Sequence, residues 1–178
     1  MAQATELKMP VNRHLTGQTG EFLVAAELVR SGFSVAVPSG NAVAFDLLAY
    51  RNKRLLAVQV KSTVGSSIQV DMGKFLDIKT DSDNGQQIIH GPRLDLDMNI
   101  LVVAVFVGKQ FGGDRFYCAW MRDFASFMAE KHGEYLTKNG GARPGPNKSS
   151  LHFAFSERHS KEDERFQSLV EILRAANI

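Results

Sequence analysis

A carboxylate, an amide and an amine lie close together in the sequence, as Asp46, Gln59 and Lys61. Carboxylate and amide oxygens are ligands for hard cations such as Mg²⁺, which bind oxygen and usually keep several waters. Such a cation polarises a phosphoryl oxygen and activates a water. A neighbouring ammonium group can stabilise the negative charge that develops. These residue types could therefore hydrolyse a phosphodiester if the fold gathers them in one place.

Two predicted strands, at 44–51 and 55–63, must position these side chains. A hairpin that turns on Asn52 and Lys53 would join them. Its register pairs residue 51 with residue 54 and continues in step along both strands.

In this register Asp46 falls directly opposite Gln59, where facing Cβ atoms lie about 5 Å apart. Side chains alternate along a strand, so Lys61 shares the face of Gln59. The hairpin therefore predicts that all three side chains gather at one end of one face.

A second carboxylate, Glu21, lies on a predicted helix at 16–31 that Thr16 or Thr19 can cap. Glu21 shares one helical stripe with the apolar residues Val24, Ala25 and Leu28, so it should lie on the packed side. It can act as a capping acid or reach the metal. Glu27 is a weaker candidate, because it reads as a solvated helix charge.

The segments around these residues resemble the PD-(D/E)xK nuclease superfamily, in its Holliday-junction-resolvase-like and homing-endonuclease-like branches. The resemblance covers residues 16–63 and rests on four stretches, Gly20–Leu28, Gly32–Phe33, Phe45–Leu48 and Val58–Thr63. It implies an α/β fold of the restriction-endonuclease type, in which a mixed central sheet is flanked by helices.

The same resemblance implies roles for individual residues. Glu21, Asp46, Gln59 and the backbone carbonyl of Val60 would bind the metal, and Lys61 would be the catalytic amine. The resemblance further implies a divalent-metal-dependent endonuclease that hydrolyses phosphodiester bonds in DNA, with Mg²⁺ or Mn²⁺ as the cofactor.

The sequence departs from the superfamily pattern at Phe45, which replaces a proline, and at Gln59, which replaces an acid. The glutamine removes a negative charge and should weaken metal affinity. It favours an alternative function, a catalytically inactive nuclease fold that binds nucleic acid or a protein partner. An RNA-directed or exonucleolytic enzyme is a third possibility.

Basic residues suggest where nucleic acid would bind. Arg51, Lys53 and Arg54 crowd the predicted hairpin tip, and Ser62 follows Lys61. We expect the three basic residues and Ser62 to contact backbone phosphate. A solvated turn explains the three basic residues equally well. The net charge is only +2, and its positive excess lies in residues 1–61, with seven Lys and Arg against four Asp and Glu. A homodimer would suit the cutting of two strands.

The remaining sequence is typical of one globular domain spanning residues 1–178, with a loose arm at 1–15. The longest apolar run has eight residues, whereas a membrane span needs about 20. We therefore expect a soluble, cytoplasmic protein without a membrane partner. Further strands are expected at 33–37, 68–72, 86–89, 99–107, 115–121 and 151–155, and helices at 123–132 and 162–176.

Overall fold

The computed structural model describes residues 12–38, 44–81, 83–110, 112–143 and 150–175. Within these ranges a central sheet holds five strands in the order β1-β2-β3-β7-β8. Their bounds are β1 Ser34–Ala36, β2 Leu47–Arg51, β3 Arg54–Thr63, β7 Leu101–Phe106 and β8 Arg115–Trp120. The β3 and β7 strands run parallel and the other neighbours antiparallel.

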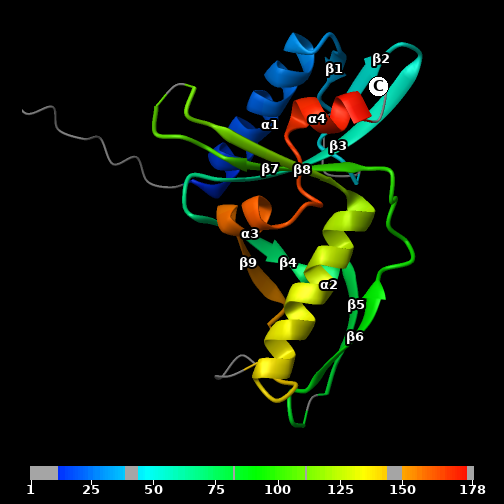
Figure 1. Ribbon diagram of the computed structural model, residues 1–178, viewed down its shortest axis with the longest axis vertical. Coiled ribbons are helices and arrows are strands. Elements are labelled where there is room, and N and C mark those ends of the chain that lie inside the picture. The colour runs from blue at the N-terminus through cyan, green and yellow to red at the C-terminus, as the bar shows by residue number, and fades with distance from the viewer. Residues whose placement is uncertain (1–11, 39–43, 82, 111, 144–149, 176–178) are drawn as a thin grey trace, which may run out of the picture.

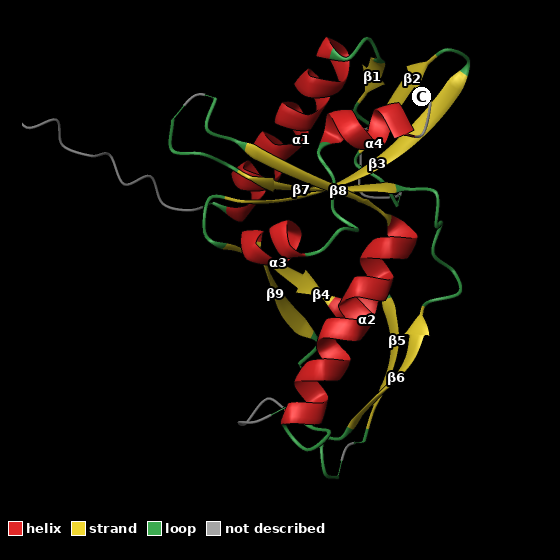
Figure 2. Ribbon diagram, in the orientation of Figure 1, coloured by secondary structure: helices red, strands yellow, loops and turns green. Residues whose placement is uncertain are grey.

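Helices and smaller sheets cover both faces of this mixed sheet (Figure 1, Figure 2). One face carries α1 (Arg13–Arg30) and α4 (Leu169–Ala175). The other carries α2 (Met121–Lys138), α3 (Glu157–Glu162), the β4–β9 pair (Ser67–Asp71 and His152–Ser156) and the β5–β6 pair (Leu76–Thr80 and Gln87–Pro92). The short 3₁₀ turn η1 (Met72–Lys74) links β4 to β5. This arrangement confirms the expected restriction-endonuclease-like α/β fold.

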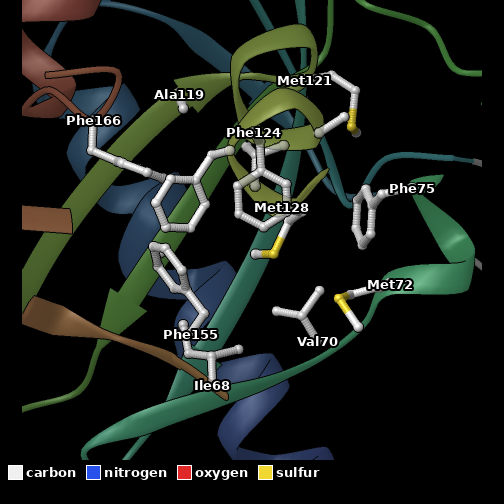
Figure 3. Packing of buried hydrophobic residues seen from close by; sticks show 14 of the residues in the cluster. Ile68, Val70, Met72, Phe75, Ala119, Met121, Phe124, Met128, Phe155 and Phe166 are labelled. Atoms are coloured by element: carbon white, nitrogen blue, oxygen red, sulfur yellow. The ribbon is translucent and has the colours of Figure 1, made fainter. Parts of the chain in front are cut away.

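Each face of the sheet has its own hydrophobic core, which explains the sequence of β7. All six residues of this strand are buried, since its side chains enter the two cores alternately. Figure 3 shows the core on the α2 side, where aromatic rings meet edge to face. The ring centroids of Phe124 and Phe155 lie 5.9 Å apart, and those of Phe124 and Phe166 lie 6.3 Å apart.

The hairpin of β2 and β3 has the predicted register. Arg51 pairs with Arg54, and the pairing continues to Leu47 and Val58. Asn52 and Lys53 both adopt positive φ angles, of 51° and 64°, as the favoured two-residue hairpin turn requires.

Helix α1 begins earlier than predicted. Asn12 caps it, because its side-chain oxygen accepts hydrogen bonds from the amides of His14 at 3.0 Å and Leu15 at 3.4 Å. The prediction of a cap at Thr16 or Thr19 was therefore wrong, and the end of the expected arm at 1–15 is helical. Residues 1–11 lie outside the described residues.

The predicted C-terminal helix at 162–176 was wrong in its first half, because α3 ends at Glu162, residues 163–168 are not helical, and α4 begins only at Leu169. Phe166 packs into the core on the α2 side, whereas Leu169 and Leu173 pack into the core on the α1 side. One continuous helix cannot bury both groups on opposite faces of a sheet. The chain therefore passes over the edge strand β8, where Gln167 bridges to Cys118.

Other differences concern boundaries. The predicted strand at 44–51 begins only at Leu47, and α2 extends to Lys138 rather than to residue 132. The pair of strands β5 and β6 occupies much of the polar stretch from 73 to 97, of which only 86–89 was expected to be a strand. In the described part of the chain, none of the helices is long and apolar enough to cross a membrane.

Gly20 lets α1 approach β3 closely. A Cβ atom at this buried position would lie 2.5 Å from Ser62 Cβ, which is far inside van der Waals contact. Beside it, the Ser62 hydroxyl donates a hydrogen bond of 2.8 Å to the Thr16 carbonyl. The glycine thus sets the distance between the helix and the strand at the level of Glu21.

We expect Gly20→Ala to destabilise the protein by about 1–3 kcal/mol, because overpacking of a tight contact forces the backbones apart. Thermal and urea unfolding would measure this change. Gly133→Ala is the matched control. Gly133 is an interior glycine of α2 whose added Cβ meets no atom within 4 Å, and it should gain about 0.5–1 kcal/mol. Equal effects at the two positions would contradict the close-contact role of Gly20.

Candidate active site

The site is built where β3 extends beyond β2. The antiparallel pairing ends at Leu47 and Val58, whereas the parallel pairing with β7 continues to Thr63. Within the described residues, the stretch 59–63 therefore has a strand neighbour on one side only. The N-terminal half of α1 lies near the other side, as the Ser62–Thr16 hydrogen bond shows.

A hollow of about 580 Å³ opens at this place. It contains all four side chains that were predicted to act together, Glu21, Asp46, Gln59 and Lys61. The α1 helix supplies the first, the segment before β2 the second, and β3 the last two. The structure thus gathers the predicted residues in one hollow, although their chemical roles stay a prediction.

Asp46 occupies the position where the β2–β3 ladder breaks. Its amide donates to the Val58 carbonyl at 2.8 Å, and its carboxylate oxygen Oδ2 accepts a hydrogen bond of 2.6 Å from the Val60 amide. The carboxylate therefore replaces the next backbone partner of β3. Two carboxylate oxygens have about four lone-pair sites, so Asp46 keeps capacity for a cation.

The backbone carbonyl of Val60 lies at the same edge. In an antiparallel pair a residue directs its N–H and its C=O to the same neighbour. Because the Val60 amide bonds to Asp46, the Val60 carbonyl also points toward the Asp46 side of β3. The opposite side is used by the alternate residues, as the bond of 2.8 Å from the Val107 amide to the Thr63 carbonyl shows.

Gln59 presents an amide oxygen without a partner. Its Nε2 donates to the Ala44 carbonyl at 3.3 Å, and since a carbonyl can only accept, this contact sets the orientation of the amide. Its Oε1 is buried and forms no hydrogen bond within the described residues. A buried acceptor without a partner costs about 1–3 kcal/mol, which a cation ligated by this oxygen would offset.

The two carboxylates disfavour each other's charge. Burial raises the pKa of Glu21 above its ordinary value of 4.5, and the negative charge of Asp46 raises it further. His14 and Lys61 act in the opposite direction. A cation placed between two such carboxylates would relieve this repulsion.

Lys61 is largely removed from water. Burial lowers the pKa of Lys61 below its ordinary value of 10.5, and Lys74 lowers it as well. Asp46 and Glu21 act against this shift, because their carboxylates favour the ammonium form. The neighbouring charges therefore act on Lys61 in opposite directions. The two carboxylates favour its protonated form, and Lys74 favours its neutral form.

Four polar side chains that line the hollow were not predicted to be there, namely those of Arg13, His14, Gln18 and Lys74. The first three belong to the beginning of α1, part of which was expected to be a loose arm, and Lys74 belongs to η1. No spacing in the sequence links Lys74 to the other residues, because only the turn after β4 carries it to the hollow. The early helix start would have been indicated by Asn12, a favoured capping residue.

The predicted phosphate contacts at the hairpin tip do not line this hollow. Arg54 lies five residues before Gln59, roughly 17 Å along β3 at about 3.3 Å per residue. Arg51 donates a hydrogen bond of 2.6 Å to the Ser31 carbonyl, and its guanidinium lies 4.4 Å from the centre of the Phe33 ring. These contacts hold Arg51 against the end of α1. Phosphate binding by Arg51, Lys53 and Arg54 stays a prediction.

Ser62 also has a structural contact. Its hydroxyl has a single hydrogen, which it donates to the Thr16 carbonyl. Ser62 can then only accept a hydrogen bond, whereas a phosphate oxygen requires a donor. Its expected contact to phosphate stays a prediction that would require this bond to break.

Two carboxylates and an amide oxygen line the hollow, and such donors fit a hard divalent cation. Val60 is not among the lining residues, so metal binding by its carbonyl stays a prediction. Among the described residues there is no group of three or more His, Cys, Asp or Glu side chains that could hold a metal ion. The donor set therefore depends on neutral oxygens as well as on acids.

The chain is similar to a known protein family and to solved structures. A family model described as PD-(D/E)XK endonuclease matches residues 11–132. The chain is similar to the solved bacterial homing endonuclease I-Ssp6803I, with 23% identity over 64% of this chain and 72% of that one and a TM-score of 0.42. It is also similar to Hjc of Archaeoglobus fulgidus, a Holliday junction resolvase. The identity is 10% over 88% of this chain and 93% of that one, and the TM-score is 0.44. Among the curated proteins, none matches the chain.

The raised pKa of Glu21 predicts a pH-dependent effect on stability. Between 4.5 and its folded-state pKa, the native protein keeps a proton that the unfolded chain releases, so stability falls as pH rises through this window. Glu21→Gln should therefore raise the melting temperature at pH 7 in EDTA, by roughly 1–3 °C. The gain should disappear below about pH 4, where the wild-type Glu21 is protonated in both states.

Glu27→Gln is the matched control on the same helix. Glu27 forms an exposed ion pair of 2.9 Å with Arg30, so its substitution should lower the melting temperature slightly or leave it unchanged. A lower melting temperature for Glu21→Gln at pH 7 would show that the Glu21 carboxylate is stabilised by folding.

Proposed function

The chain belongs to the PD-(D/E)XK endonuclease family, and from this premise we propose that it is a divalent-metal-dependent endonuclease that hydrolyses phosphodiester bonds in DNA. The observation that carries the proposal is the buried Oε1 of Gln59. This oxygen has no hydrogen-bond partner within the described residues. It belongs to a hollow that also holds two carboxylates and an amine, which is the donor set that a hard cation and a phosphate require.

In the proposed site Glu21, Asp46, the Gln59 amide oxygen and the Val60 carbonyl hold the metal. The bond of 2.6 Å from the Val60 amide orients the Asp46 carboxylate. The contact of Gln59 Nε2 with the Ala44 carbonyl orients the amide. Both ligands are thus fixed before a cation arrives, which reduces the cost of assembling the site.

A bound Mg²⁺ or Mn²⁺ would polarise the phosphoryl oxygen and make a water nucleophilic. Lys61 would donate hydrogen bonds to an oxygen of the scissile phosphate and stabilise the negative charge that develops there. Its burial strengthens this interaction, since charges attract more strongly where water is excluded. Lys74, in the same hollow, would add positive charge for the phosphate backbone.

DNA as the substrate follows from the family, and the hollow is consistent with it. Arg13, Lys61 and Lys74 line the hollow, and none of them has a side-chain ion pair or hydrogen bond within the described residues. Such cations are available for phosphate groups. A homodimer remains part of the proposal, because two sites would be needed to cut both strands of a duplex together.

The second candidate function is a nuclease fold that binds nucleic acid or a protein without cleavage. The replacement of an acid by Gln59 favours it, since the site then has fewer negative charges for a metal. Nicking and metal titration separate the two functions.

Supercoiled plasmid should be nicked by the wild type in the presence of Mg²⁺ or Mn²⁺ and left intact in EDTA. Lys61→Met keeps the length of the side chain but removes the charge, and should lower the rate about 10²–10³-fold. Lys79→Met, at an exposed lysine of β5, is the matched control and should nick at the wild-type rate. Intact plasmid with every metal tested would support the non-cleaving alternative.

Calorimetric titration of Mn²⁺ tests whether Gln59 is a ligand. Gln59→Glu should bind the metal at least about tenfold more tightly, because carboxylates are better ligands for hard cations than amides. Gln59→Ala should weaken binding by about tenfold or more. The rate of cleavage by Gln59→Glu need not rise, since tighter binding of the ground state does not lower the barrier. Equal metal affinity in the three proteins would rule out Gln59 as a ligand.

A further inference from the structure

A second hollow, of about 270 Å³, lies beside the first and has a different lining. Arg13 lines both hollows, and Ser62 in the second follows Lys61 of the first along β3. The second hollow is lined by Arg13, Thr16, Ser62, Thr63, Val64, Ser67, Ile68 and Gln69. The two hollows therefore adjoin at the first turn of α1 and the end of β3.

The lining of the second hollow suits an anion and does not suit a metal. Its described residues include one cation, four hydroxyl groups and one amide, and no carboxylate. Hard cations require oxygen ligands with negative charge among them. Arginine and hydroxyl donors are the usual contacts of backbone phosphate.

Two of these donors are available. The Arg13 side chain forms no ion pair or hydrogen bond within the described residues. Thr63 Oγ1 accepts a hydrogen bond of 3.0 Å from the Gly65 amide, and its hydroxyl hydrogen remains for another acceptor. The first amides of α1 do not contribute, because Asn12 already binds those of His14 and Leu15.

The spacing along β3 relates the two hollows. Lys61 and Thr63 are two residues apart and point to the same face, so their Cα atoms lie about 6.6 Å apart. This separation is comparable with that of successive phosphates along one strand of nucleic acid. A backbone whose scissile phosphate meets Lys61 could therefore place the next phosphate beside Thr63 and Arg13.

We propose that the second hollow is a subsite for the phosphate next to the scissile one, held by Arg13 and Thr63. This inference rests on the proposed function for the identity of its ligand as DNA. It adds a positioning role for two residues that are not among the proposed metal ligands. Arg13 fixes the register of the strand, and Thr63 donates a hydrogen bond to the phosphate.

The test measures binding of a fluorescent 30-base-pair duplex in EDTA, where no cleavage is needed. Arg13→Gln should weaken binding about tenfold at low salt and reduce the slope of log affinity against log salt by about one. Thr63→Val, which keeps the shape of the side chain, should weaken binding about threefold. Melting temperatures check that both variants fold.

Arg122→Gln is the matched control. Arg122 is exposed near the start of α2 and lies two residues after Trp120. Trp120 pairs with Leu101 at one end of β7, whereas Thr63 pairs with Phe106 at the other end. It should bind like the wild type. Equal losses for Arg13→Gln and Arg122→Gln would overturn the subsite.

A duplex with neutral methylphosphonate linkages separates a phosphate contact from an indirect effect. Arg13→Gln and the wild type should bind this duplex equally. A loss of the same size as with ordinary DNA would also overturn the subsite. If the wild type nicks no plasmid but binding still depends on Arg13, the proposed catalysis fails and the subsite stands.

Discussion

The hydrogen bond of 2.6 Å from the Val60 amide to the Asp46 carboxylate determines where the site can form. This bond lies at the point where β2 stops pairing with β3. There the Val60 amide donates to a side-chain oxygen instead of to a backbone carbonyl of β2. The strand is thereby kept extended and bonded, while its edge becomes accessible to the beginning of α1. The direction of the Val60 carbonyl follows from this exchange, and the edge that it leaves without a strand neighbour is where α1 brings Glu21 close to β3.

The site works against the stability of the fold. Gln59 buries an oxygen without a partner, Lys61 loses hydration, and Glu21 and Asp46 repel each other. The cores on both faces of the sheet must compensate, which is consistent with the burial of every residue of β7. Departures from the rules of good packing are expected at functional sites.

The pairing of β2 with β3 and the place of Glu21 on α1 could be predicted from local sequence, because both depend on neighbours in the chain. The turn at Asn52 and Lys53 sets the pairing of β2 with β3, and one helical stripe places Glu21 on the packed side of α1. Residues brought in by tertiary contacts, such as Lys74, left no pattern. The apolar pattern at 162–176 likewise resembles one helix, since a sequence does not reveal that Phe166 and Leu169 enter cores on opposite faces.

The crossing of the chain over β8 has a consequence for self-association. Gln167 exchanges two backbone hydrogen bonds with Cys118, at 2.8 and 2.9 Å, and so covers part of one edge of the sheet, whereas the other edge is the three-residue strand β1. Short or covered edges discourage the addition of a strand from a second chain. Two copies would therefore meet through other surfaces. The exposed residues Leu15, Phe22 and Val29 recur every seven positions along α1, so they lie on one face of the helix and form an apolar stripe there.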